Sequence, residues 1–119
     1  MTIMRLICVS DDLVDGGTGV RFTVTHHGKE EPAFVIRYGG KPHAYLNRCA
    51  HVPVELDWQP GQFFDFSGLY LICTTHGALY APESGRCVGG RCDRKGLFPL
   101  TVAERDGQIL LVEENEKGV

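Results

Sequence analysis

Apolar and polar residues alternate with a period of two along much of the chain, which is typical of half-buried β-strands. The clearest example is residues 20–25, where valine or phenylalanine alternates with arginine or threonine. A short apolar run over residues 4–9 predicts a first strand, and residues 11–19, rich in aspartate and glycine, predict a turn. Because no stretch shows a convincing amphipathic helical pattern, we expect a nearly all-β chain.

Later runs of β-forming residues are separated by turn sequences and predict antiparallel hairpins. Gly39 and Gly40 adopt positive φ without steric cost, and Asp106-Gly107 is a favourable two-residue turn. A further strand is expected over residues 69–73, and residues 114–119 are expected to be a frayed polar tail. The predicted strand pairs are residues 33–38 with 43–48, 78–80 with 86–88, and 98–103 with 108–113.

Length and composition favour a single soluble domain over residues 1–119. The net charge of -3 argues against nonspecific nucleic-acid binding. The opening apolar run is interrupted too early, by Asp11 and Asp12, for a signal peptide or a membrane anchor. An odd count of 5 cysteines fits ligands plus free thiols better than a disulfide framework, so we expect a cytoplasmic protein.

Two short segments combine a cysteine with a histidine, and we call them the first and second clips. The first clip is Cys49-Ala50-His51, and the second is Cys73-Thr74-Thr75-His76. A cysteine and a histidine at such spacing can enter one coordination sphere from a single tight turn, and two such turns provide four ligands. Two thiolates and two imidazoles suit either a tetrahedral zinc or an iron–sulfur cluster.

The order of the ligands and their flanking residues distinguishes these alternatives. A zinc finger of the two-cysteine, two-histidine type usually pairs its cysteines in one turn and its histidines on one helix. Here each clip is mixed and lies among strand-like runs. This pattern resembles the Rieske signature, Cys-x-His followed by Cys-x-x-His. The resemblance covers roughly residues 33–113 and includes Gly77, Tyr80, the turn at residues 83–85 and the run at residues 96–100.

The resemblance implies one [2Fe-2S] cluster per chain, with the two cysteines on one iron and the two histidines on the other. The expected ligands are Cys49, His51, Cys73 and His76. Tyr80 matches the family's tyrosine and is expected to donate a hydrogen bond to a cysteine sulfur. The expected fold is a small antiparallel β-sandwich like the Rieske iron–sulfur protein domain. Its cluster-binding subdomain, about residues 46–91, contains the two ligand loops.

The resemblance also bears on the redox potential. High-potential relatives commonly place a serine two residues after the second histidine and an additional disulfide-forming cysteine in each clip. The corresponding residues here are Ala78, Val54 and Thr75. Because hydrogen bonds to the cluster sulfurs favour the more negative reduced state, their loss lowers the potential. We therefore expect a midpoint at the low end of the Rieske range, on the order of -150 mV.

Several residues lie outside the four-ligand pattern. Cys87 and Cys92 can form a small disulfide if their Cα atoms lie within about 7 Å, but thiols are the expected form in a reducing compartment. His26 and His27 are adjacent and point to opposite faces of a strand, so they are not expected to share a metal. The aromatic stretch over residues 55–68 is expected to anchor the ligand loops. Arg86, Arg91, Arg94 and Lys95 form either a basic patch for an acidic redox partner or a solvated loop.

These features favour a soluble one-electron carrier that resembles Rieske-type ferredoxins of ring-hydroxylating oxygenase systems. Its expected partners are a flavoprotein reductase as donor and an oxygenase or reductase as acceptor. The chain shows no mononuclear iron triad, so it is not expected to be an enzyme alone. One alternative is the small Rieske subunit of a reductase complex such as nitrite reductase. Another is a zinc-stabilised binding module without redox activity.

Overall fold

The computed structural model describes residues 2–26, 28–49, 54–57, 59–75, 77–90 and 95–114. Within these ranges the chain is almost entirely β, which confirms the predicted fold class. The short 3-10 helix η1 (Ser10–Asp12) follows the first strand, and no helix in the described part of the chain is long and apolar enough to span a membrane. The strands are β1 (Thr2–Val9), β2 (Val20–His26), β3 (Lys29–Tyr38), β4 (Lys41–Leu46), β5 (Leu71–Cys73), β6 (Ala78–Tyr80), β7 (Cys87–Gly89), β8 (Pro99–Leu100), β9 (Val102–Arg105) and β10 (Gln108–Glu114).

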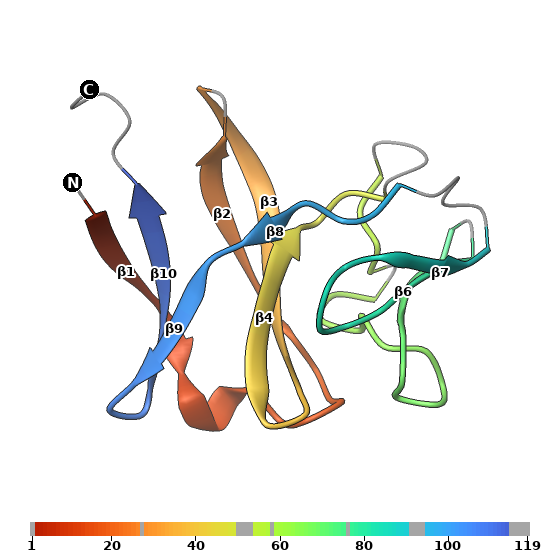
Figure 1. Cartoon of the computed structure of the whole chain (residues 1–119), viewed down its shortest axis with the longest axis horizontal. Helices are drawn as coiled ribbons and strands as arrows, with labels where there is room; N and C mark the ends of the chain where they lie inside the picture. Colours follow the sequence, from red (N-terminus) through yellow and green to blue (C-terminus); the bar gives the residue numbers. More distant parts are fainter. Residues whose placement is uncertain are drawn as a thin grey trace.

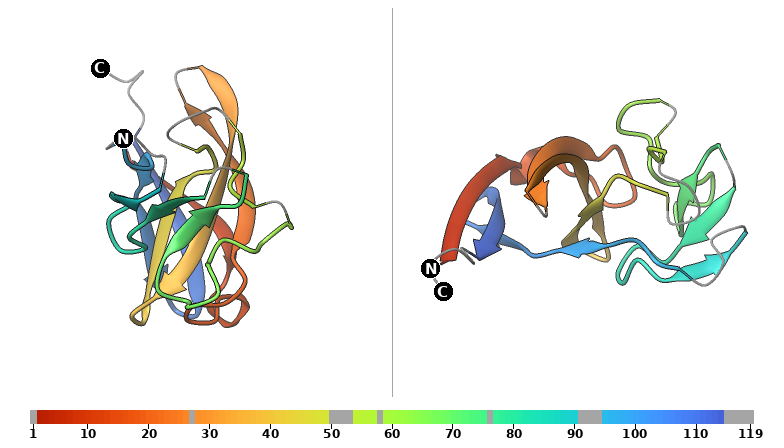
Figure 2. Two further views of the ribbon diagram at one scale, coloured as in Figure 1. Left: turned by 90° about the vertical axis from the view of Figure 1, so that its right-hand side faces the viewer. Right: turned by 90° about the horizontal axis from the view of Figure 1, so that it is seen from above.

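The strands form three antiparallel sheets. Their orders are β1-β10-β9, β2-β3-β4-β8 and β5-β6-β7. In Figure 1 the four-stranded sheet lies between the sheet of the terminal strands and the small sheet β5-β6-β7. Seen from above in Figure 2, β1 and β10 lie at one end of the molecule and β6 and β7 at the other. The segment between β4 and β8 therefore forms a separate layer beside the central sheet.

Residues 33–36 of strand β3 are buried on both faces of the strand, because the central sheet is covered on both sides there. Phe34 and Ile36 contribute to one core, which we call the site-side core, and Ala33 and Val35 face the sheet of the terminal strands. This alternation is the two-residue period of a strand. The site-side core comprises Phe34, Ile36, Tyr45, Cys49, Leu56, Phe63, Leu71, Cys73, Ala78, Tyr80 and Leu97.

Two of the predicted tight turns occur as expected. Gly39 and Gly40 have φ of 62° and 80° between β3 and β4, and Asp106 and Gly107 have φ of 52° and 75° between β9 and β10. These left-handed conformations suit glycine and are tolerated by aspartate. Strand β4 begins and ends earlier than the predicted residues 43–48.

The predicted strand over residues 98–103 is wrong as a single element. The structure divides it into β8, which pairs with β4, and β9, which pairs with β10 in a different sheet. Thr101 lies between them and its carbonyl accepts a hydrogen bond from the Val112 N–H at 2.9 Å. The chain therefore passes from one sheet to another within an apparently continuous β-rich run. The predicted tail is wrong at Glu114, which is the last residue of β10 and pairs with Thr2, and residues 115–119 lie outside the described residues.

Candidate metal centre

The cysteines of the two clips are brought to one place by the ends of two strands. Cys49 follows β4 by a few residues and is 2% exposed, and Cys73 is the last residue of β5 and is fully buried. Both belong to the site-side core, although they are far apart in the sequence. Two buried thiols in one core provide the sulfur ligands that an iron–sulfur cluster requires.

The other two predicted ligands, His51 and His76, lie outside the described residues. Among the residues that the structure describes, no group of three or more His, Cys, Asp or Glu side chains is placed to hold a metal ion. The cysteines therefore fit an iron–sulfur cluster by their chemistry and burial, and the complete four-ligand set stays a prediction.

The second clip is held in a tight turn between β5 and β6. The Gly77 N–H donates a hydrogen bond to the Cys73 carbonyl at 2.7 Å, and Gly77 has φ of 71°. The backbone of Gly90 packs directly behind this turn, because a Cβ atom added at Gly90 would lie 2.8 Å from the Ala78 Cα. The turn is therefore supported from behind by a residue that must lack a side chain.

Backbone hydrogen bonds close the first clip and tie it to the second. The Cys49 N–H donates to the Val54 carbonyl at 2.7 Å. The Leu56 carbonyl accepts two hydrogen bonds from Thr74, one from the N–H at 3.2 Å and one from the hydroxyl at 3.0 Å. Because Thr74 directly follows Cys73, the first clip is positioned against the second through Leu56.

Tyr80 lies beside the first cysteine, as its match to the Rieske pattern led us to expect. It is fully buried on β6, and its hydroxyl oxygen is 3.5 Å from the Cys49 Sγ, within the range of a hydrogen bond to sulfur. A thiolate has no proton to donate, so the tyrosine must be the donor when Cys49 is a metal ligand. Tyr80 is therefore placed to stabilise negative charge on that sulfur.

Sequence reasoning missed Tyr45, which holds a third loop near the site. Its hydroxyl donates to the Pro82 carbonyl at 2.7 Å, and burial raises its pKa well above the ordinary value for tyrosine. The ring packs on Gly85, where an added Cβ would lie 2.7 Å from the Tyr45 Cε1. The only signal in the sequence is the position of Tyr45 between Ala44 and Leu46, which places it on the opposite face of β4.

The aromatic stretch only partly anchors the ligand loops. Phe63 stacks on Phe34 with ring centroids 4.0 Å apart and belongs to the site-side core. Phe66 is fully exposed, so the expectation that it anchors the loops is wrong. Phe66 lies in the turn at residues 65–68, which is closed by a hydrogen bond from the Gly68 N–H to the Asp65 carbonyl. This turn holds the Phe66 side chain outside the core. Trp58 lies outside the described residues.

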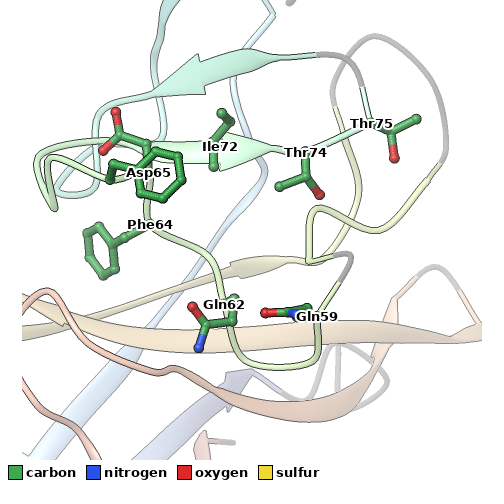
Figure 3. A pocket seen from close by; sticks show the side chains of 8 residues that line it. Gln59, Gln62, Phe64, Asp65, Ile72, Thr74 and Thr75 are labelled. Carbon is green, nitrogen blue, oxygen red and sulfur yellow. The ribbon is translucent and has the colours of Figure 1, made fainter.

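A groove of about 630 Å³ lies beside the second clip. Figure 3 shows Thr74 and Thr75 at one end of this groove, with Phe64 and Ile72 along it. Gln59 and Gln62 line it from the opposite side. The groove therefore begins at the turn that carries the second pair of predicted ligands and extends toward an exposed aromatic residue, Phe66.

The remaining cysteines differ in their state. Cys8 is a free, buried core residue, and burial is the main cause that raises the pKa of its thiol. Cys87 is disulfide-bonded, so the expectation that it is a thiol is wrong. Cys87 is the first residue of β7, and Gly90, which follows this strand, has φ of 75°. Cys92 lies outside the described residues.

The other candidate residues are only partly described. His26 packs edge-on against Phe98, with ring centroids 4.6 Å apart, and His27 lies outside the described residues. Arg86 and Lys95 are exposed, while Arg91 and Arg94 lie outside the described residues. The basic patch and the solvated loop therefore both stay predictions for this segment.

Comparison with protein families identifies the class of this protein. Residues 4–113 match the family described as the Rieske [2Fe-2S] domain. Because the match spans nearly the whole chain, the protein belongs to this family. A [2Fe-2S] cluster is the cofactor of the family, which confirms the expected cofactor and is consistent with the two buried cysteines. A search of curated proteins finds no match.

Solved structures share the fold at low sequence identity. The ferredoxin of carbazole 1,9a-dioxygenase from Nocardioides aromaticivorans IC177 is 20% identical, with a TM-score of 0.68 over 91% of this chain and 95% of that chain. A Sphingomonas yanoikuyae B1 ferredoxin is 18% identical, with a TM-score of 0.73 over 94% and 100% of the two chains. The terminal oxygenase of carbazole 1,9a-dioxygenase from Novosphingobium sp. KA1 is 22% identical, with a TM-score of 0.70 over 95% of this chain but 30% of that chain.

Proposed function

We propose that this protein is a one-electron carrier that acts as the ferredoxin component of an oxygenase-type electron-transfer chain. The observation that carries the proposal is the burial of Cys49 and Cys73 in one core, with the Tyr80 hydroxyl directed at the Cys49 sulfur. Membership of the Rieske family supports the same conclusion. When bound, a [2Fe-2S] cluster accepts and releases one electron at a time.

In this proposal Cys49 and Cys73 bind one iron, and His51 and His76 bind the other. Tyr80 then donates its hydrogen bond to a ligand sulfur, which favours the more negative reduced state. Cys49 and Cys73 lie in a buried core, and in this proposal the electron leaves through the two histidine ligands. The ligand region corresponds to a cluster-binding subdomain of about residues 46–91 within a single domain over residues 1–119.

The proposed donor is a flavoprotein reductase, and the proposed acceptor is an oxygenase. Solved structures that share this fold include a complex of reduced oxygenase and oxidised ferredoxin in carbazole 1,9a-dioxygenase, whose matched chain is covered to 96%. We place the protein in the cytoplasm, with neither membrane nor nucleic acid as a partner, and we propose that it carries electrons without catalysing a reaction alone.

The alternative that we retain is a tightly held Rieske subunit of a reductase complex such as nitrite reductase. The fully exposed Phe66 beside the groove favours it, because exposed aromatic residues are enriched at protein interfaces. Copurification of a large reductase subunit in stoichiometric amount would distinguish this alternative from a diffusing carrier. The zinc-stabilised module is not retained, because the family to which the chain belongs binds a [2Fe-2S] cluster.

The proposal is tested by anaerobic purification followed by iron and acid-labile sulfide analysis and EPR of the reduced protein. We expect about two irons and two sulfides per chain and a Rieske-type spectrum. Cys73→Ala should lose the cluster, whereas Cys8→Ala, which changes a buried free thiol in another core, should retain it. A colourless protein with one zinc per chain would contradict the proposal.

Carrier activity is tested separately from cofactor binding. A potentiometric titration of the holoprotein should follow a single one-electron transition. The reduced protein should then be reoxidised in stopped flow by a purified ring-hydroxylating oxygenase faster than by the same oxygenase with its own Rieske cluster removed. Equal rates with both oxygenase preparations would argue against an oxygenase as acceptor.

A further inference from the structure

Asn47 and Asp57 are the two buried residues in the described part of the chain whose side chains end in an amide or a carboxylate, at 1% and 7% exposure. We propose that they are positioning residues that hold the first clip against the second and thereby set the spacing of the two cysteine ligands. The inference rests on the proposed function, in which Cys49 and Cys73 bind the same cluster.

Hydrogen bonds join this pair across the base of the first clip. The Asn47 side-chain amide donates to the Asp57 Oδ1 at 2.9 Å, and the Leu56 N–H donates to the Asn47 Oδ1 at 2.9 Å. The Asp57 Oδ2 accepts from the Gly61 N–H at 2.9 Å. Because an ionised carboxylate can only accept, it forces the NH₂ group of Asn47 toward itself and the amide oxygen toward Leu56.

The same hydrogen bonds continue into the second clip. The Leu56 N–H donates to the Asn47 amide oxygen, and the Leu56 carbonyl accepts both hydrogen bonds from Thr74. Asn47 lies two residues before Cys49, and Thr74 directly follows Cys73. A displacement of Leu56 would therefore change the position of one cysteine relative to the other.

The charge of Asp57 indicates a role in specifying geometry. Its side chain is fully buried, and it is paired with Arg21, whose Nε is 3.5 Å from the Asp57 Oδ2. Arg21 also pairs with Glu55 at 2.8 Å and is itself 39% exposed. Burying a carboxylate is costly, and apolar residues of similar volume are often at least as stabilising. Donors and acceptors that can pair in only one arrangement fix the relative positions of the two clips, which apolar packing does not do.

The test uses three variants of the holoprotein: Asp57→Asn, Asn47→Asp, and the double variant that carries both substitutions. Asp57→Asn leaves one amide N–H pointing at another donor, and Asn47→Asp places two carboxylates face to face. We expect each single variant to release its cluster to a ferrous chelator about tenfold faster than wild type. Their reduced EPR lines should also be broader, because the ligand spacing becomes heterogeneous.

The double variant, in which the two side chains are exchanged, provides the rescue. The carboxylate introduced at position 47 would accept from the Leu56 N–H and from the new amide at position 57, whose oxygen would accept from the Gly61 N–H. Every hydrogen bond of the original pair is thereby restored, with donor and acceptor reversed between the two side chains. We expect the cluster-release rate and the EPR linewidth of the double variant to return toward wild-type values, although its carboxylate lies at a different distance from Arg21.

Asp15→Asn is the matched control. The Asp15 carboxylate also accepts two backbone hydrogen bonds, from Gly39 at 3.2 Å and Gly40 at 2.6 Å, but these hold the β3–β4 turn. It should release the cluster at the wild-type rate. Wild-type release by the two single variants, equally fast release by the control, or no rescue in the double variant would each overturn the inference. A wild-type protein without iron would instead refute the proposed function.

Discussion

The hydroxyl of Tyr80 lies 3.5 Å from the Sγ of Cys49, and both side chains are buried. This contact joins β6, the strand that follows the second clip, to the cysteine of the first clip. A single side chain on the small sheet therefore interacts with a proposed ligand, Cys49, that follows a strand of the central sheet. The contact connects the packing of the protein to the proposed electronic properties of its cofactor.

Replacing Tyr80 with phenylalanine should lower the midpoint potential. The lost hydrogen bond to sulfur stabilises the more negative reduced state, so the variant should be harder to reduce. Tyr45→Phe is the control, because it removes a buried hydroxyl that donates to a carbonyl of Pro82. The control should lose about 1 kcal/mol of stability with little change of potential. Potentiometric titration measures the effect, and equal potentials for wild type and Tyr80→Phe would contradict this role of Tyr80.

The wild-type midpoint is expected at about -150 mV, and Ala78→Ser should raise it. Ala78 is fully buried and pairs with Cys73 across the β5–β6 turn, so a hydroxyl there is added close to a proposed ligand. Ala33→Ser introduces the same buried hydroxyl on β3, away from the clips, and should lower stability without raising the potential. The argument fails if Ala78→Ser leaves the midpoint unchanged or if the wild-type midpoint lies well above zero.

Gly90→Ala should destabilise the protein and reduce its iron content. The new Cβ would meet the backbone of Gly77 and Ala78, and φ of 75° is unfavourable for alanine. Gly39→Ala has a similar φ of 62° with nothing within 4 Å, so it should lose only about 1 to 2 kcal/mol. Urea unfolding and iron analysis compare the two variants. Equal losses would show that Gly90 matters only through its backbone conformation.

Glu104→Gln should lower stability at neutral pH more than at acidic pH. The hydrogen-bonded Arg37 guanidinium lowers the pKa of Glu104 to about 2, with the two groups 2.7 Å apart. A lowered pKa contributes stability above the ordinary value of 4.5, and this contribution is lost as the pH falls toward about 2. Because the pair is partly solvated, we expect a difference of about 0.2 to 1 kcal/mol near pH 7. Urea unfolding of wild type and Glu104→Gln at pH 7 and pH 3 measures this difference in stability. A difference as large at pH 3 as at pH 7 would contradict the lowered pKa of Glu104.

Local patterns accounted for the parts of the fold that depend on neighbours in sequence. Gly39-Gly40 and Asp106-Gly107 form the predicted turns because their backbone preferences act within a few residues. The run at residues 98–103 was predicted as one strand, because periodicity does not report which sheet a residue joins. Its division at Thr101 depends on β4, which is distant in the sequence and pairs with β8, whereas β9 pairs with β10 in a local hairpin.

The amino-acid sequence by itself determined the all-β class, the two clips and the resemblance to the Rieske family. These properties are readable because the spacing of ligands and of apolar residues is local. Only the tertiary structure decided that Tyr45 holds the loop at Pro82 and that Asn47 and Asp57 face each other in the core. Such contacts join segments whose separation along the chain carries no periodic signal, so they arise only when the sheets pack.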